Sequence, residues 1–160
     1  MKFEKFLKMT AGHGTIVDRE DGGKWLFFAN VLMRIPDGVN VIAALRMDES
    51  ERIKNIFEEY ASENCAGAEL YAAELPTPDA AGSKVIRIFR DTDGGEIGIS
   101  NKEFSLIEKG DSVINVYDEE FDDNIPAALM VAEFDPSQGA EIVGVIFNVG
   151  YFAALINERK

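Results

Sequence analysis

Two Asp-Gly-Gly triplets constrain the fold of this chain more than any other feature. They stand at residues 21–23 and 93–95, and each lies between short apolar segments. Glycine adopts a positive φ without a Cβ clash, so this arrangement is typical of a tight β-hairpin turn. The sequence therefore predicts antiparallel hairpins, and we expect an α+β fold rather than a wound parallel sheet.

The whole chain, residues 1–160, reads as one domain. We expect a mainly antiparallel sheet of seven to nine strands with two to four helices. The segments expected to supply strands are residues 15–18, 25–33, 39–45, 69–75, 84–90, 96–100, 112–117, 127–134 and 141–147. The run at 25–33 hardly alternates between apolar and polar residues, which indicates burial on both faces. The prolines and glycine of residues 76–83 predict an exposed loop, and residues 101–109 fit either a short helix or a strand.

The clearest predicted helix covers residues 49–63. Apolar residues recur there at helical spacing and line one face: Ile53, Ile56, Phe57, Tyr60 and Ala61. Asp48 and Glu51 resemble a capping box with Asp48 as the cap. Shorter helices are expected at residues 2–10 and from Val149 onward.

An internal similarity links the two halves of the chain. Residues 15–49 align with residues 87–121 without gaps, with eight identities in 35 positions that include both Asp-Gly-Gly triplets. Turn glycines recur for physical reasons, so chance similarity is one explanation. A duplication is the other, and it would give each half an equivalent three-stranded unit about a pseudo-twofold axis.

Charge and residue types exclude several classes of function. The chain has 29 acidic and 16 basic residues, a net charge of -13, one histidine and one cysteine. No basic stripe is present to neutralise phosphates, so direct binding to nucleic acid or to an anionic membrane is not expected. No apolar run approaches the ~20 residues of a membrane span, and no secretion signal is apparent. The lone Cys65 cannot form an intrachain disulfide, and a cytoplasmic location is expected.

Few candidates exist for catalysis or metal binding. His13 lies between two glycines but has no second histidine or nearby cysteine, so the count excludes a zinc site of the usual kind. Asp91, Asp93 and Glu96 place three acids on one turn, as hard cations prefer. Their spacing fails the calcium-loop pattern, and Asp-Gly-Gly is also an ordinary hairpin turn. No glycine-rich phosphate motif is present, so no cofactor is expected.

The densest acidic run is the first place to look for a binding surface. It comprises Asp118, Glu119, Glu120, Phe121, Asp122 and Asp123. Such a run can dock a basic protein, with Phe121 as an apolar anchor. The alternative is a solvated loop between strands. The apolar run from Trp25 to Met33 reads as a core strand first and as a possible homodimer face second.

These observations favour a non-catalytic protein-interaction or assembly module with a basic protein partner. The first alternative is a small hydrolase that uses carboxylates alone or with magnesium, with Asp91, Asp93, Glu96 and His13 as the nearest candidates. The second alternative is a nucleic-acid mimic that presents arrayed carboxylates to a basic partner. A mimic needs its acids in ordered rows, whereas scattered acids would argue against it.

Overall fold

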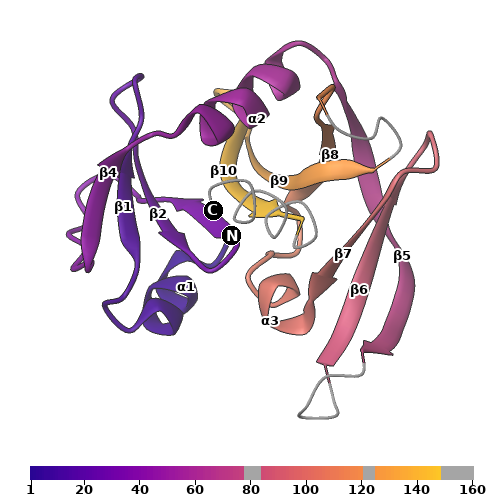
Figure 1. Ribbon diagram of the computed structural model, residues 1–160, viewed down its shortest axis with the longest axis horizontal. Helices are drawn as coiled ribbons and strands as arrows, with labels where there is room; N and C mark the ends of the chain where they lie inside the picture. The colour runs from indigo at the N-terminus through magenta and orange to yellow at the C-terminus, as the bar shows by residue number, and fades with distance from the viewer. Residues whose placement is uncertain (78–83, 121–124, 149–160) are drawn as a thin grey trace.

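The computed structural model describes residues 1–77, 84–120 and 125–148, and these form one sheet with helices on both of its faces (Figure 1). The three helices of the described residues are α1 (Phe3–Thr10), α2 (Glu51–Ala61) and α3 (Asn101–Phe104). The ten strands of the same residues are β1 (Thr15–Asp18), β2 (Lys24–Phe28), β3 (Val31–Arg34), β4 (Leu45–Asp48), β5 (Cys65–Thr77), β6 (Lys84–Asp91), β7 (Glu96–Ser100), β8 (Ser112–Tyr117), β9 (Pro126–Asp135) and β10 (Gly139–Phe147). The predicted α+β class is confirmed.

The strand order across the sheet is β4-β1-β2-β3-β10-β9-β8-β5-β6-β7. Neighbouring strands are antiparallel except β1 and β4, which are parallel. The described residues hold ten strands, above the seven to nine predicted, because the apolar run at 25–33 folds into the two strands β2 and β3. Ala29 has a φ of 55° in the turn between them, so the run reverses direction instead of continuing.

The predicted strand at 39–45 is wrong. Residues 39–44 form no strand, and β4 begins only at Leu45. The carbonyl of Gly14 accepts hydrogen bonds from the amides of Ala44 (2.9 Å) and Leu45 (3.4 Å), so pairing with β1 starts at that point. Pro76 and Thr77 also differ from prediction, because they belong to β5 rather than to the expected loop.

The two Asp-Gly-Gly turns form hairpins of the same register. Val17 pairs with Trp25 in the first, and Phe89 pairs with Ile97 in the second, at equivalent positions of the aligned segments. Gly22 and Gly94 each adopt a positive φ, 88° and 86°. The similarity ends after the second strand, where β3 follows one hairpin and α3 follows the other. The hairpin turns were predicted correctly, while the duplication stays a prediction.

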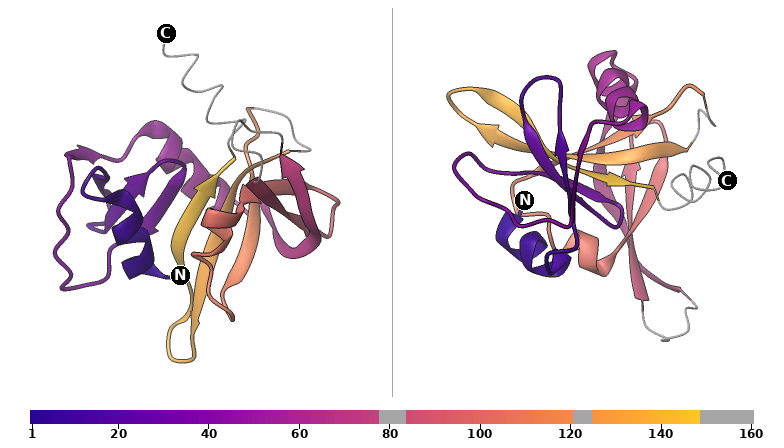
Figure 2. Two further views of the ribbon diagram at one scale, coloured as in Figure 1. Left: turned by 90° about the horizontal axis from the view of Figure 1, so that it is seen from below. Right: turned by 60° about the vertical axis from the view of Figure 1, so that its left-hand side comes forward.

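Side chains of the sheet feed two apolar clusters, one on each face. Along β2 and β3, Trp25 and Leu32 pack on the face under α2, whereas Leu26 and Met33 pack on the face that carries α1 and α3. Figure 2, right, shows α2 on the opposite side of the sheet from α1 and α3. The predicted burial of this run on both faces is therefore confirmed, while its use as a dimer face stays a prediction.

The end of the sheet that holds β5, β6 and β7 curls over, so that β7 lies against β9 (Figure 1). Ile97 and Ile99 of β7 are buried with Leu129 of β9 in one cluster. This closure buries alternate side chains of β7, the last strand at this end of the sheet. At the other end, β4 is exposed along its length.

Both predicted helices that fall in the described residues are present, with a different cap. Ser50 is the N-cap of α2, and its hydroxyl accepts a hydrogen bond from the Ile53 amide at 3.3 Å. The expected cap, Asp48, ends β4 instead, because the strand still pairs with β1 there. The ambiguous segment at 101–109 contains α3, and the helix predicted from Val149 lies outside the described residues.

Candidate functional site

The predicted binding run begins where β8 ends and lies against α2. Asp118 is only 3% exposed, and its carboxylate accepts a hydrogen bond from the Glu120 amide at 3.0 Å. The Arg52 guanidinium of α2 lies 3.7 Å from Asp118 and 3.9 Å from Glu120. Asp118 therefore fixes the turn rather than facing solvent, whereas Glu119 and Glu120 are exposed. The remaining members of the run, residues 121–123, lie outside the described residues.

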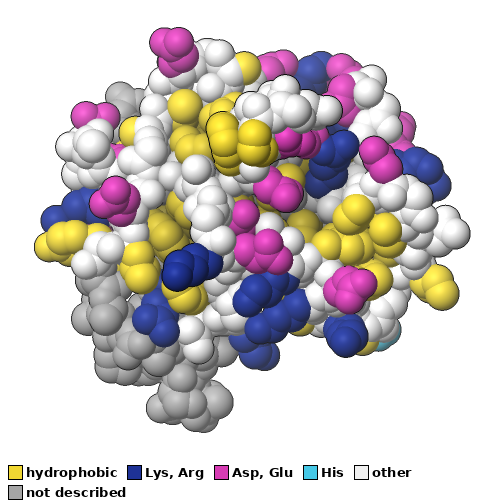
Figure 3. All heavy atoms as spheres, turned by 180° about the vertical axis from the view of Figure 1, so that it is seen from behind, with side chains coloured by type: hydrophobic (Ala, Val, Ile, Leu, Met, Phe, Trp, Pro, Cys, Tyr) yellow, Lys and Arg dark blue, Asp and Glu magenta, His cyan; other side chains and the backbone are white. Residues whose placement is uncertain are grey.

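Exposed acids of α2 and of its C-terminal end extend this acidic region. We define the acidic surface as the exposed residues Glu51, Glu58, Glu63, Glu119 and Glu120. The contact between Arg52 and Glu120 joins its two segments. Figure 3 shows acidic side chains along the upper edge of the molecule, the end where Figure 1 places α2. Such a grouping attracts cationic side chains of a partner.

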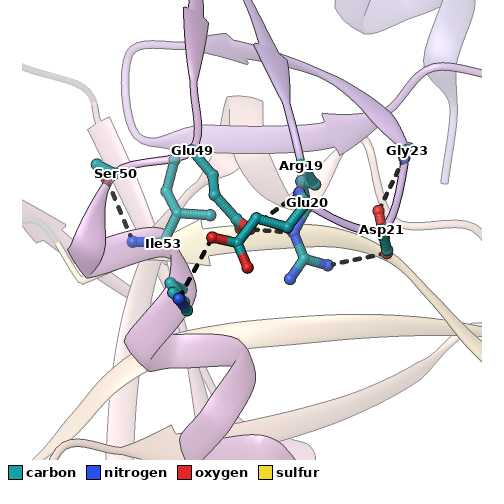
Figure 4. Close-up of polar contacts among 8 residues, drawn as sticks. Arg19, Glu20, Asp21, Gly23, Glu49, Ser50 and Ile53 are labelled. Atoms are coloured by element: carbon teal, nitrogen blue, oxygen red, sulfur yellow. Dashed lines mark hydrogen bonds and ion pairs between the residues drawn. The ribbon is translucent and has the colours of Figure 1, made fainter.

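An ion pair next to the acidic surface anchors the β1–β2 hairpin to the start of α2 (Figure 4). The Arg19 Nε donates to the Glu49 carboxylate at 3.0 Å, and the side chains are only 15% and 5% exposed. The guanidinium also stacks over the Phe57 ring, 3.6 Å from its centroid. Because Glu49 also accepts from the Glu20 amide at 3.1 Å, this carboxylate holds the turn in place.

The outer part of the same network is solvent-exposed. The Asp21 carboxylate accepts from the Gly23 amide at 2.8 Å and lies 3.6 Å from Arg19. The Lys54 ammonium lies 3.4 Å from Glu20, and this contact raises the pKa of Lys54. These contacts hold the β1–β2 turn against α2. The exposed acids of the acidic surface take no part in them.

The three acids of the turn at 91–96 do not converge on one point in the structure. Asp91 is 5% exposed, and its carboxylate accepts from the amides of Asp93 (2.9 Å) and Gly95 (3.0 Å), from Asn115 Nδ2 (3.1 Å) and from the Tyr117 hydroxyl. Burial alone would raise the pKa of Asp91, but these hydrogen bonds outweigh it and hold the pKa below its ordinary value. Burial and the adjacent Asp91 raise the pKa of Tyr117.

The other two acids of that turn point elsewhere. Glu96 forms an ion pair with Arg90, with 2.7 Å between its carboxylate and the Arg90 Nε, and Asp93 is exposed. Among the described residues, no three histidine, cysteine or acidic side chains come together in a way that could hold a metal ion. His13 is exposed and follows α1 in the chain, and Figure 1 shows α1 on the other side of the molecule from β6 and β7.

An open cavity of about 940 Å³ lies on the inner side of the curled end of the sheet. Apolar rings line it from Tyr71, Phe89 and Phe104, together with charges of both signs. Arg90 stacks over Tyr71 at 3.3 Å, so its cation is engaged at the rim. Asp91, the acid at the wall of the cavity, is already saturated by the four donors described above.

Sequence reasoning missed the partners of the buried acids. Asn115 and Tyr117 complete the Asp91 network, and Arg52 joins Asp118 to α2. A signal for the first was present, because Asn115 interrupts an otherwise apolar strand and a buried amide needs partners. Arg52 gave no comparable signal, since arginine is ordinary on a helix surface.

Comparison with protein-family models, with curated proteins and with solved structures yields no match. The described part of the chain has no helix of the length and apolar character needed to cross a membrane. The function must therefore be inferred from the surfaces and the buried hydrogen-bond networks of the chain itself.

Proposed function

We propose that the protein is a non-catalytic binding protein that recognises a basic protein partner through the acidic surface. The observation that carries this proposal is the exposure of five carboxylates on two adjoining segments, α2 with the residues just after it and the residues that follow β8. Arg52, the basic residue at their junction, lies against Asp118 and Glu120. The surface therefore presents more negative than positive charge to an approaching protein.

The net charge of the whole chain supports the same function. A charge of -13 attracts a basic partner over about one Debye length, roughly 8 Å at physiological salt. Surface charges of this kind raise the association rate and select against acidic partners. We therefore expect binding that weakens as salt increases.

The buried acids support binding over catalysis. Asp91, Glu49 and Asp118 each accept hydrogen bonds that fix a turn, and Glu103 caps α3 while accepting from Asn30 at 2.8 Å. A hydrolase would need such carboxylates to face a substrate. A nucleic-acid mimic would need a row of acids, and no such row stands out in the described residues, since acids such as Asp18, Glu96 and Glu141 pair with arginines on separate strands.

A charge-matched pair of variants tests the proposal. The first replaces Glu51, Glu58, Glu63 and Glu120 with glutamine on the acidic surface. The control replaces four exposed acids elsewhere, Glu4, Asp37, Glu108 and Glu133, with their amides, so both variants have the same net charge. Binding of a fluorescent lysine- and arginine-rich peptide is measured by anisotropy at low and at physiological salt.

We expect the acidic-surface variant to bind about tenfold more weakly at low salt, since four exposed charge contacts contribute a few tenths of a kcal/mol each. The control should lose little affinity, because its substitutions lie away from the surface. Equal losses in the two variants would show that net charge alone attracts the peptide. The acidic surface would then be discarded as the binding site.

A further inference from the structure

Strand β4 is an exposed edge of the sheet. It holds four residues, Leu45 to Asp48, and within the described residues it pairs on one side only, with β1. All four side chains are exposed, and Figure 1 shows the strand at the outer end of the sheet. An exposed strand edge offers backbone donors and acceptors to another strand.

The backbone of β4 presents alternate residues outward. Two amides point toward β1. The Leu45 amide donates to the Gly14 carbonyl at 3.4 Å, and the Glu49 amide donates to the Asp18 carbonyl at 2.9 Å. Residues of one parity face the neighbouring strand in a parallel ladder, so the residues between them face away. Arg46 and Asp48 therefore direct their N–H and C=O groups to the open side.

Exposed apolar side chains lie on this strand and on the segment that precedes it. We define the edge patch as Val39, Ile42, Leu45 and Met47, which are 41%, 86%, 68% and 41% exposed. In Figure 3, apolar side chains appear at the surface on the side where Figure 1 places β4, with left and right reversed. An exposed apolar group of this kind beside an open strand is typical of an interaction surface.

We propose that β4 is the contact between two copies of this chain, paired antiparallel about a twofold axis at Met47. The outward parity of Arg46 and Asp48 permits only twofold axes that pass through a residue, at Leu45, Arg46, Met47 or Asp48 within the strand. An axis at Leu45 sets Arg46 opposite Ala44, which precedes the strand, so it brings no opposite charges together. An axis at Arg46 sets Arg46 opposite itself, and an axis at Asp48 sets two aspartates together. The axis at Met47 places Arg46 opposite Asp48 of the second copy, twice.

Charge therefore selects one register of the four. Opposite charges directly across an antiparallel pair are favourable, and like charges are unfavourable. Arg46 also pairs with Asp18 of its own chain, at 2.6 Å and 2.7 Å, which holds its guanidinium on that face of the sheet. In the selected register each Arg46 thus lies between an acid of its own chain and an acid of the other copy.

The apolar residues suit the same register. Met47 aligns with Val17 of β1, so both side chains point to the face under α2. Two copies of Met47 then meet at the axis as a non-hydrogen-bonded pair, with the Leu45 side chains on the same face. A contact made by a four-residue strand and the edge patch belongs to the small class of specific interfaces, below about 1,200 Å², so we expect weak, transient association.

Charge variants test the pairing. Arg46→Glu and Asp48→Lys each place like charges across both pairs and should weaken self-association at least about tenfold. When the two variants are mixed, the introduced glutamate of one faces the introduced lysine of the other, and the unchanged Asp48 faces the unchanged Arg46. The mixture should therefore form a heterodimer. Sedimentation equilibrium up to about 1 mM, at several salt concentrations, measures each mass, and thermal unfolding checks that each variant is folded.

Two results would overturn the proposal. The first is a monomer mass for the wild type at every concentration and salt, since about 1 mM protein detects even weak association. The second is an Asp48→Lys variant that dimerises as the wild type does. Asp48→Lys leaves the contact between Arg46 and Asp18 in place, so it tests the register even if Arg46→Glu fails to fold.

Cysteine cross-linking provides an independent test in a Cys65→Ser background. A non-hydrogen-bonded pair has Cα atoms about 4.5 Å apart, which suits a disulfide, so Met47→Cys should cross-link on mild oxidation. In the same register the two copies of residue 45 lie four residues apart along the strand, about 13 Å, and cannot cross-link. Because Leu45 is the more exposed residue, random collision would favour it. Faster cross-linking of Leu45→Cys than of Met47→Cys would therefore rule out this register.

Discussion

Replacing Tyr117 with phenylalanine tests whether the Asp91 network closes the curled end of the sheet. The substitution removes one hydroxyl and leaves the ring in place. The hydroxyl donates to a buried carboxylate that ties the β6–β7 turn to β8. The site has no spare room, since a Cβ added at Gly95 would overlap the Tyr117 hydroxyl.

The expected loss follows from the type of hydrogen bond. A hydrogen bond to a charged group contributes about 1.5–3 kcal/mol, and three other donors remain on Asp91 to share its charge. We therefore expect Tyr117→Phe to lower the free energy of unfolding by about 1.5–2 kcal/mol near pH 7. Tyr71→Phe is the matched control, because Tyr71 is 57% exposed and should lose less than about 0.5 kcal/mol.

The pH dependence of the stability difference between wild type and Tyr117→Phe shows whether the lost hydrogen bond is its cause. The pKa of Tyr117 is raised in the folded protein above its ordinary value of 10.0, so the unfolded chain loses this proton first as pH rises. The stabilisation is complete below pH 10 and declines as pH rises above it. Urea unfolding of wild type and variant between pH 7 and 11 should show the difference shrinking by up to about 1 kcal/mol at pH 11, after allowance for partial exposure.

Two outcomes would refute this reasoning. A difference below about 0.5 kcal/mol at pH 7 would mean that Asp91 does not depend on the hydroxyl. A difference that stays constant up to pH 11 would mean that the loss arises from altered packing. The Tyr71→Phe control should follow the wild type throughout the pH range.

Two further comparisons test the turns of both hairpins and the contact of the β1–β2 hairpin with α2. Glu49→Gln should lower the free energy of unfolding by about 2–3 kcal/mol, because it leaves the nearly buried Arg19 with only the exposed Asp21 carboxylate as a counter-charge, while Glu20→Gln on an exposed pair should cost far less. Equal losses in urea unfolding would contradict the role of burial. Gly22→Ala and Gly94→Ala should each cost about 1–2 kcal/mol, because both positions have a positive φ, and a neutral result in thermal unfolding at either would show that its turn relaxes.

Local signals in the sequence predicted much of the fold. The Asp-Gly-Gly turns placed both hairpins, and the apolar face of residues 49–63 placed α2, because turn chemistry and helical periodicity are properties of short segments. The strands at 96–100 and 112–117 match the structure in full. Each of these elements needs only its own residues to be recognised.

The predictions that differ from the structure concern segments whose conformation depends on tertiary contacts. Residues 39–45 are apolar, but the chain leaves Ile42 in solvent and pairs the more polar Leu45–Asp48 segment with β1. The acidic run was predicted as one surface, yet Asp118 is buried against α2 by Arg52, a residue 66 positions earlier in the chain. The curl that brings β7 to β9 likewise depends on contacts between distant segments, so no single window of sequence reveals it.

The two clusters that share one sheet restrict where this protein can change. Strands β2, β3 and β10 lie between the two apolar clusters. A polar side chain introduced on either face of these strands would be buried without access to water. Mutational drift in the middle of the sheet is thus limited to exchanges of similar volume. New recognition properties can arise far more readily at the rims, on the outer side of α2 and along the open strand at the far end.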